Sequence, residues 1–388
     1  MNHPLFPRVS RRSALVGLAA LPAAFRTSIT TPALGAESNN FIIRERVPEN
    51  LESDFSALDS FITPNDKFFV RSHFAVPRLN PKIWRLKVEG AIKQPIELTY
   101  EDILGMTAET KPVTLECAGN GRVMLSPKVD GVQWQLGAVG NAEWTGVPLS
   151  AVLSRAGIHE KAVDVVLEGT DAGDVSKPSR PAKPFHFARS VPLDIARNGG
   201  ILLAYKMNGQ PLPESHGFPL RAIVPGWYGM ASVKWLSHIV ITERPYQGFF
   251  QTVDYAYWQH REGSPVRVPI TSMEVKAQIA RPTFAEVIPK SSQYRVFGAA
   301  WAGSANIAKV QVSTNGGKQF ADAKLLGEPV KNSWRLWEFA WTTPATPSKR
   351  VLLAKATDTN GVSQPMDRDK DRENYMINHV LPIEVTVR

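Results

Sequence analysis

V-T-L-E-C-A-G-N-G-R, residues 113–122, contains the only cysteine of the 388-residue chain, Cys117. Apolar and polar residues alternate up to Cys117, which predicts a strand that carries the thiol on its apolar face and ends at the turn 118–121. Arg122 follows this turn, so its permanent positive charge can return toward the sulfur. A lone cysteine is most often a small buried hydrophobic residue. The alternative is a thiol used in chemistry, and the rest of the sequence favours it.

The first 36 residues have the pattern of an export signal. They contain four arginines and no acidic residue, and an apolar run over residues 14–25 follows the pair Arg11-Arg12. This pattern predicts a twin-arginine signal that ends near Ala36, and a run this short, interrupted by Pro22, does not predict a membrane anchor. We therefore expect a periplasmic protein. Because the twin-arginine route carries folded proteins, the signal also favours a cofactor that is inserted before export.

Charge and cysteine content exclude several classes of protein. The first 36 residues hold four of the 45 basic residues and none of the 36 acidic ones, so their removal lowers the net charge from +9 to +5. This modest excess, without a run of like charges, argues against nucleic-acid binding and favours a basic site for a small anion. One cysteine excludes an internal disulfide, a covalent haem attachment and a multi-cysteine metal site. About 350 residues suit two domains.

Basic residues stand among apolar ones in two places. Residues 68–74 predict a strand with Arg71 and His73 on one face, which is either an anion site or a polar pair that faces solvent. His216, Arg221 and Lys234 lie in a turn-rich apolar segment. Buried cations need partners, so these three form either structural ion pairs or a site for a phosphate- or pterin-like group.

Other elements are indicated more simply by their patterns. Residues 82–90 predict a strand, and residues 100–106 and 149–156 predict short helices. Residues 163–169 predict a buried strand that opens into a loop at Asp171. Such a loop is either an ordinary turn or a contact for a ligand rich in hydroxyl or amine groups.

After Arg267 the pattern changes to short alternating strands. A hairpin turn is expected at 314–317. The whole predicts an immunoglobulin-like sandwich over residues 269–388, a module that commonly supplies a dimer interface. The predicted fold class is thus α+β: a domain of mixed sheets with few helices over residues 37–268, then the all-β sandwich. The strands expected in the sandwich are 296–301, 307–313, 337–341, 351–357 and 383–387.

Five segments, in order, resemble the sulfite oxidase family of molybdenum enzymes. With the sandwich, the resemblance covers nearly all of the chain after the signal. It implies a molybdopterin-binding catalytic domain, a dimerisation domain and one molybdenum–molybdopterin cofactor per chain. The segments are Phe-Phe-Val-Arg-Ser-His at 68–73, Cys-Ala-Gly-Asn-Gly-Arg at 117–122, Met-Asn-Gly-Gln-Pro-Leu-Pro at 207–213, His-Gly-Phe-Pro-Leu-Arg at 216–221 and Ser-Val-Lys-Trp-Leu at 232–236.

The resemblance also implies roles for single residues. Cys117 would be the thiolate ligand of molybdenum. Tyr255 would be the active-site tyrosine, and Trp134 would form a wall of the pocket. The arginines expected at the substrate oxygens are Arg71 and Arg122, completed by Arg368 or Arg372. The residues expected to hold the pterin and its phosphate are Phe69, Val70, Arg71, Ser72, His73, Asp171, His216, Arg221, Ser232, Val233 and Lys234.

The implied reaction is the oxidation of sulfite to sulfate. The family's vertebrate members carry a haem domain ahead of the molybdenum domain, and residues 37–68 are too few for one. With the export signal, this favours a bacterial periplasmic dehydrogenase, a homodimer that passes electrons singly to an external c-type cytochrome. One alternative is an exported molybdopterin reductase of the same family that acts on sulfoxides. Another is a cofactor-free exported binding protein.

Overall fold

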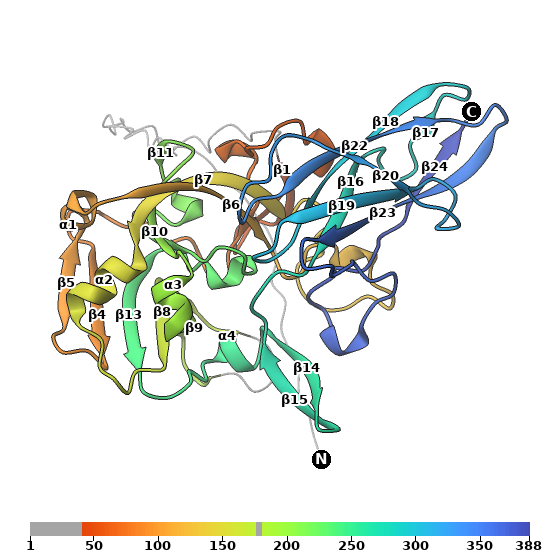
Figure 1. Ribbon diagram of the computed structural model, residues 1–388. Coiled ribbons are helices and arrows are strands. Elements are labelled where there is room, and N and C mark those ends of the chain that lie inside the picture. The colour runs from red at the N-terminus through yellow and green to blue at the C-terminus, as the bar shows by residue number, and fades with distance from the viewer. Residues whose placement is uncertain (1–40, 176–180) are drawn as a thin grey trace, which may run out of the picture. The chain divides into compact units, whose positions relative to one another are not determined.

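The computed structural model describes residues 41–175 and 181–388. The export signal predicted over residues 1–36 lies outside the described residues. No helix within these ranges has the length and apolar character needed to cross a bilayer. Figure 1 shows that the described chain is built mainly from strands, with a few short helices.

Three sheets form the part of the chain before residue 250. One is a mixed sheet in which β4 and β13 run parallel while the other neighbours are antiparallel. Its order is β5 (Ile96–Thr99), β4 (Arg85–Gly90), β13 (Leu236–Thr242), β8 (Asp164–Gly173) and β9 (Phe185–Pro192). The second sheet has the order β11 (Gln210–Pro211), β10 (Leu202–Met207), β7 (Val139–Pro148) and β6 (Glu109–Glu116), with β12 (Arg221–Ile223) also paired to β10. The third is β1 (Phe41–Glu45), β2 (Asn50–Ser53) and β3 (Val70–Arg71).

Short helices connect these strands: α1 (Tyr100–Gly105), α2 (Leu149–Ala156), α3 (Leu193–Asn198) and α4 (Phe249–Thr252). Helix α1 begins with a capping box, in which the Thr99 hydroxyl accepts from the Asp102 amide and the Asp102 carboxylate accepts from the Thr99 amide. Helix α2 buries every residue at the spacing i, i+3, i+4 and i+7 from Leu149, and it ends where Gly157 adopts a φ of +69°. The helices predicted at 100–106 and 149–156 are confirmed.

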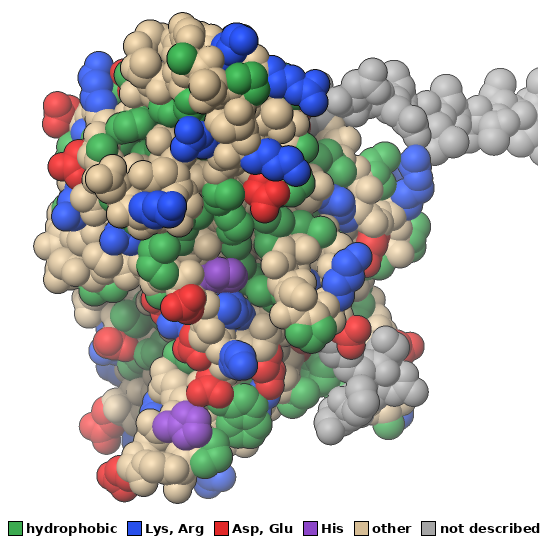
Figure 2. All heavy atoms as spheres, turned by 90° about the vertical axis from the view of Figure 1, so that its right-hand side faces the viewer, with side chains coloured by type: hydrophobic (Ala, Val, Ile, Leu, Met, Phe, Trp, Pro, Cys, Tyr) green, Lys and Arg blue, Asp and Glu red, His purple; other side chains and the backbone are tan. Residues whose placement is uncertain are grey.

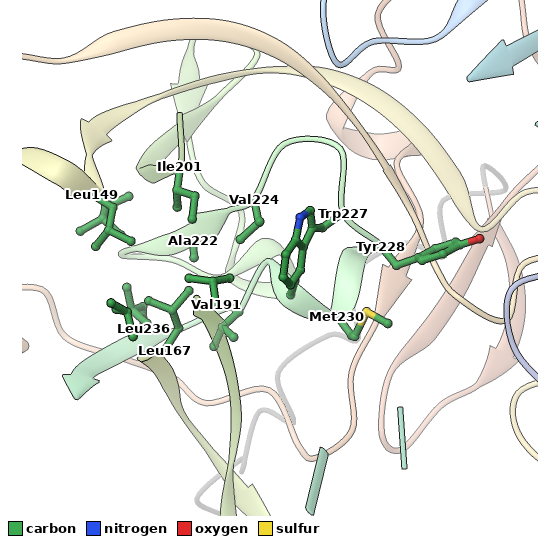
Figure 3. Close-up of a cluster of buried hydrophobic side chains, with 14 of the residues drawn as sticks. Leu149, Leu167, Val191, Ile201, Ala222, Val224, Trp227, Tyr228, Met230 and Leu236 are labelled. Carbon is green, nitrogen blue, oxygen red and sulfur yellow. The ribbon is translucent and has the colours of Figure 1, made fainter. Parts of the chain in front are cut away.

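The apolar core that supports the site is shown in Figure 3. Leu149 of α2, Leu167 of β8 and Leu236 of β13 come from separate elements and belong to one buried cluster. Each fully buried side chain of this size contributes about 1.5–3 kcal/mol relative to an exposed one. The cluster continues to Met230, which lines the cavity described below.

The remaining strands form a hairpin and a sandwich. The hairpin is β14 (Ala256–Arg261) with β15 (Ser264–Pro269). One sheet of the sandwich is β16 (Lys276–Arg281), β18 (Gln293–Trp301), β22 (Arg335–Thr342) and β21 (Lys324–Leu325). The other is β17 (Val287–Ile288), β24 (Ile383–Val387), β23 (Ser348–Asp358), β19 (Ile307–Ser313) and β20 (Ala321–Asp322), and the two sheets share one buried core. The predicted fold class, mixed sheets with few helices followed by an all-β sandwich, is confirmed.

Several strand predictions need correction in extent. The strand expected over residues 82–90 begins only at Arg85, because residues 81–83 form a turn. The strand expected over residues 68–74 is reduced to Val70–Arg71, because the Ser72 amide donates to the side-chain oxygen of Asn50 instead of to a neighbouring strand. The strand expected over 163–169 continues to Gly173 as part of β8, so Asp171 lies within a strand and not in a loop.

The second half of strand β6, residues 113–116, is buried on both faces, although its alternation predicted one apolar and one polar face. Thr114 and Glu116 are as buried as their apolar neighbours. The sandwich segments cover this second face: Trp334 donates its amide to the Thr114 hydroxyl, and Lys276 pairs with Glu116. Thr114 and Glu116 are therefore buried contacts between the sandwich and the end of β6, directly before Cys117.

Figure 2 shows one face of the molecule, with Lys and Arg side chains interspersed among Asp and Glu. On this face the mixed charges leave no stripe of a single sign, which is the usual mark of a nucleic-acid surface.

Candidate active site

A cavity at the end of β6 is lined by side chains from several segments that are far apart in the sequence. Its empty volume is about 680 Å³, counting the space at its open mouth. The predicted site residues that line it are Phe69, Arg71, Ser72, His73, Cys117, Asp171, His216, Arg221, Ser232, Val233, Lys234 and Tyr255.

The Cys117 thiol is held at a fixed position in this cavity. Its side chain is 7% exposed, and its amide donates to the carbonyl of Ala138 over 2.9 Å. The turn that follows is closed by the Asn120 amide, which donates to the Cys117 carbonyl over 2.9 Å, and Gly121 takes a φ of +97°. That left-handed conformation favours glycine, which explains the residue at this point of the turn.

Two basic side chains, Arg221 and Lys234, border the cavity. Arg221 donates to the carbonyls of His216 and Ser232 over 2.9 and 3.0 Å, and Lys234 donates to the Ser72 hydroxyl over 3.0 Å. Burial lowers the pKa of Arg221 to about 9, and burial together with the Arg221 charge lowers the pKa of Lys234 to about 7. A bound anion would stabilise both charges, so this part of the cavity suits a phosphate group.

His216 is not the third cation that its sequence context indicated. Burial lowers the pKa of its imidazole to about 3, and the charges of Arg221 and Lys234 act in the same direction. At neutral pH the ring is therefore uncharged, so it can accept or donate one hydrogen bond to a ligand.

Asp171 offers the cavity a buried oxygen that no described residue satisfies. Its Oδ1 atom has no hydrogen-bond partner in the described part of the chain. Burial raises the pKa of Asp171 to about 6, although Lys234 opposes this shift. A Cβ atom on Gly169 would lie 2.4 Å from this oxygen and 2.7 Å from the Lys234 carbonyl, so only glycine fits there. An orphaned carboxylate beside two cations fits a ligand with both N–H donors and an anionic group, as a pterin phosphate has.

Arg71, His73 and Tyr255 line the cavity together with Cys117. Burial works to lower the pKa of Arg71, but its interactions with Tyr255 and Cys117 outweigh this, so the pKa is raised and the guanidinium stays charged. Burial also raises the pKa of Tyr255, which remains a neutral phenol. The Tyr255 hydroxyl lies 2.7 Å from Nε2 of His73. One fixed positive charge and one phenol hydroxyl are suitable groups for binding an oxyanion.

Arg122 lies next to this site, but it is not one of the described residues that line the cavity. Its Nε donates to the Asn374 carbonyl over 3.1 Å, and one terminal nitrogen donates to the Val132 carbonyl over 2.6 Å. The guanidinium carbon stands 5.2 Å from the ring centre of Tyr375. Two nitrogens of Arg122 are thus bound by backbone carbonyls, and its place at the substrate oxygens, which the family resemblance implied, stays a prediction.

Arg368 and Arg372 also point elsewhere. Arg368 donates to the carbonyls of Met376 and Glu373 over 2.7 and 3.0 Å, which holds the loop to which it belongs. Arg372 donates to Asp369 over 3.1 Å and lies 3.4 Å from Glu274. Within the described chain neither guanidinium lines the cavity, because each is bound by its own loop or by a neighbouring carboxylate.

Two further predicted residues, Val70 and Trp134, are buried behind the cavity wall. Both belong to the core, and neither is one of the described residues that line the cavity. Trp134 packs in the same apolar cluster as Cys117, so it supports the site from behind instead of forming its wall.

The sequence interpretation missed Tyr375 and Asp254. The Tyr375 hydroxyl donates to Oδ1 of Asp254 over 2.9 Å, and its ring centre lies 4.9 Å from that of Tyr255. Asp254 was identifiable only as the neighbour of Tyr255. Tyr375 follows the sandwich strand β23 in the chain, and no periodicity or motif marks it.

The fold and site define an oxidoreductase of the molybdopterin-binding class. Residues 73–250 match the family model described as the oxidoreductase molybdopterin binding domain, and residues 267–386 match the Mo-co oxidoreductase dimerisation domain. The chain belongs to the sulfite oxidase family, as the sequence resemblance predicted.

Relatives from distant organisms support this assignment. The chain is 35% identical over 355 residues to human mitochondrial sulfite oxidase, covering 86% of this chain and 62% of that protein. It is 32% identical over 353 residues to the sulfite oxidase of Arabidopsis thaliana, covering 83% of this chain and 87% of the relative. Among solved structures, the sulfane dehydrogenase SoxCD from Paracoccus pantotrophus superposes with a TM-score of 0.77 at 25% identity, over 94% of this chain and 93% of that chain.

Proposed function

We propose that this protein is a molybdenum-dependent sulfite dehydrogenase of the periplasm, which oxidises sulfite to sulfate and passes electrons singly to a c-type cytochrome. The observation that carries the proposal is the meeting of the Cys117 thiol, Arg71 and Tyr255 in one cavity with Asp171 and Lys234. This combination offers a ligand for a soft metal, groups for an oxyanion, and groups for a pterin phosphate within one site.

The residues present fit the molybdenum–molybdopterin cofactor. Cys117 would supply the protein's thiolate, and the described residues contain no group of three His, Cys, Asp or Glu side chains arranged to hold a metal. The unsatisfied oxygen of Asp171 suits the pterin's N–H groups, and Arg221 and Lys234 suit its phosphate. When bound, the molybdenum centre supplies the oxygen-atom transfer and accepts two electrons.

The chain's own side chains bind and orient the substrate. Sulfite carries one to two negative charges near neutral pH, and the guanidinium of Arg71 provides a fixed opposite charge. The Tyr255 phenol, kept neutral by burial, can donate a hydrogen bond to a sulfite oxygen. Holding the anion by its oxygens leaves the sulfur lone pair free to react.

The acceptor, the location and the assembly rest on other features. The predicted twin-arginine signal supports the periplasm, and a c-type cytochrome is a natural one-electron acceptor there. The match to a dimerisation domain over residues 267–386 supports a homodimer. The same domain argues against the sulfoxide reductase alternative, whose members resemble the catalytic domain alone.

The structural likeness to SoxCD favours one second candidate, oxidation of a sulfane sulfur. That protein is a sulfane dehydrogenase, and its chain matches this one over nearly the whole length of both. A side-by-side assay with sulfite and thiosulfate separates the two candidates. Faster reduction of cytochrome c with sulfite supports the first proposal, and turnover with thiosulfate alone would replace it by the second.

The cofactor assignment is tested with two variants that are expected to fail differently. Cys117→Ser removes the thiolate, so sulfite-dependent reduction of cytochrome c should be abolished while the pterin is retained. Arg221→Gln removes a charge next to the expected phosphate, so pterin and molybdenum should both be lost. Molybdenum by mass spectrometry and pterin by fluorescence after oxidation provide the comparison. Turnover by Cys117→Ser would show that the thiolate assignment is wrong.

A further inference from the structure

We propose that Tyr375, supplied by the segment between β23 and β24, is a positioning residue of the active site that fixes Tyr255 and couples it to Arg122. The inference rests on the proposed function, because it concerns how the same site binds its oxyanion. It also implies that a segment between two sandwich strands supports the catalytic site, in addition to any role of the sandwich in dimerisation.

The ring of Tyr375 packs against Tyr255, which lines the cavity, and its hydroxyl bonds the residue before Tyr255. The side chain is 5% exposed, and the hydroxyl donates to Oδ1 of Asp254 over 2.9 Å. Asp254 directly precedes Tyr255, so this hydrogen bond holds the backbone that carries the cavity phenol. The two tyrosine rings lie 4.9 Å apart at 37°, which restricts the rotation of Tyr255.

The other contact of the Tyr375 ring is with Arg122. The guanidinium carbon lies 5.2 Å from the ring centre, within the range of a cation–π interaction. Arg122 does not line the cavity in the described chain, whereas Tyr255 does. A contact series therefore runs from Arg122 through Tyr375 to Tyr255, and Arg122 acts on the site through this series.

The segment around Tyr375 is fixed to the turn that follows Cys117. The Met376 amide donates to the Ala118 carbonyl over 2.7 Å, and Asn374 accepts from Arg122. Glu373 and Met376 have φ values of 49° and 53°, which are unusual for residues other than glycine. A backbone held in such conformations on both sides of Tyr375 points to a fixed placement and not to a free loop.

The protonation state of Tyr375 suits this role. Burial raises its pKa well above the ordinary value, and interactions with Tyr255 and Asp254 act in the same direction. The phenol therefore keeps its proton at neutral pH and remains a donor to the Asp254 carboxylate. Since a hydrogen bond to a charged group is stronger than one between neutral groups, its loss should be measurable.

The test compares sulfate binding and sulfite kinetics in wild type, Tyr375→Phe and Tyr375→Leu, with Tyr257→Phe as the matched control. Tyr257 lies in β14, and its hydroxyl accepts from Gln259 outside the cavity. Tyr375→Phe keeps the ring, so we expect sulfate affinity by calorimetry to fall about tenfold, with a similar rise in KM and a smaller change in kcat. Tyr375→Leu should lose more sulfate affinity than Tyr375→Phe. The molybdenum content of both variants should equal that of wild type.

A double-mutant cycle distinguishes positioning from a general loss of stability. In a Tyr255→Phe background, Tyr375→Phe should lower the sulfate affinity much less than it does in wild type, because the two residues act as one unit. The inference would be overturned if Tyr375→Phe lowered the sulfate affinity equally in both backgrounds. It would also be overturned if both Tyr375 variants bound sulfate as well as Tyr257→Phe does. A different result would show that the proposed function is wrong: wild-type protein with full molybdenum would neither oxidise sulfite nor bind sulfate. In that case the crystal structure of Tyr375→Leu decides, since an unmoved Tyr255 overturns the inference and a displaced one supports it.

Discussion

Lys276 and Glu116 form a buried ion pair between the sandwich and the strand that carries Cys117, and its removal should destabilise the whole protein. Nζ of Lys276 lies 2.8 Å from the Glu116 carboxylate, with side chains 1% and 2% exposed. The same carboxylate accepts from Trp301 over 2.8 Å and from Asn120 over 3.1 Å. Lys276 also donates to the Asn120 carbonyl over 3.1 Å. The network thus joins β16 and β18 to the Cys117 turn.

Lys276→Met removes the cation while keeping a side chain of similar length. Burial lowers the pKa of Lys276, and the Glu116 carboxylate opposes that shift, so the charge of Lys276 depends on this partner. Removing one partner leaves a buried carboxylate without its counter-charge, which costs about 3–5 kcal/mol. We therefore expect the free energy of unfolding to fall by about this amount in the cofactor-free protein.

The matched control is Lys324→Met in the same sandwich. Lys324 is 74% exposed and lies 3.2 Å from Glu338. An exposed pair of this kind contributes about 0–1 kcal/mol. Denaturation in urea, followed by tryptophan fluorescence, measures both variants against wild type. If Lys276→Met loses no more stability than Lys324→Met, the buried pair does not join the two parts of the chain as described.

Three further predictions concern the cavity. Gly169→Ala should lower the molybdenum content measured by mass spectrometry, because the added carbon would lie 2.4 Å from the Asp171 carboxylate; full content would show that the strand can shift. The pKa of Asp171 is about 6 in the folded chain against an ordinary value of 3.8. Between pH 3.8 and 6 the folded state therefore binds a proton on Asp171 that the unfolded state has lost. The stability of cofactor-free wild type relative to Asp171→Asn should therefore rise as pH falls from 7 to 4, and a difference that does not change with pH would contradict this. Arg122→Gln should raise the KM for sulfite with little loss of molybdenum, whereas loss of the metal would make Arg122 a cofactor residue.

The cofactor side of the cavity was largely predictable from the sequence. His216, Arg221 and Lys234 stand close together in an apolar segment, and buried basic groups of this kind need a ligand or a partner. What the pattern does not reveal is the charge of each group. The neutral state of His216 follows first from its burial and then from the nearby charges of Arg221 and Lys234, which only the folded chain defines.

The substrate side was predicted less well, because it depends on contacts between distant segments. Arg122 folds back over the turn after Cys117, since a Cβ atom on Gly119 would lie 2.2 Å from its terminal nitrogen, but it binds the Val132 and Asn374 carbonyls and is not among the described residues that line the cavity. Tyr375 and Lys276 belong to the sandwich part of the chain, and nothing in the alternation of its strands shows that it supplies side chains to the site. The motifs of the family resemblance therefore led to most of the residues that line the cavity, but not to the residues that pack against them from outside.

The most direct test of the central claim is the molybdenum content per chain of the purified exported protein, measured together with sulfite-dependent reduction of cytochrome c. The proposed function predicts close to one molybdenum per chain and turnover that depends on sulfite. Protein exported with its signal and lacking molybdenum, or protein with full metal that does not oxidise sulfite, would contradict the account.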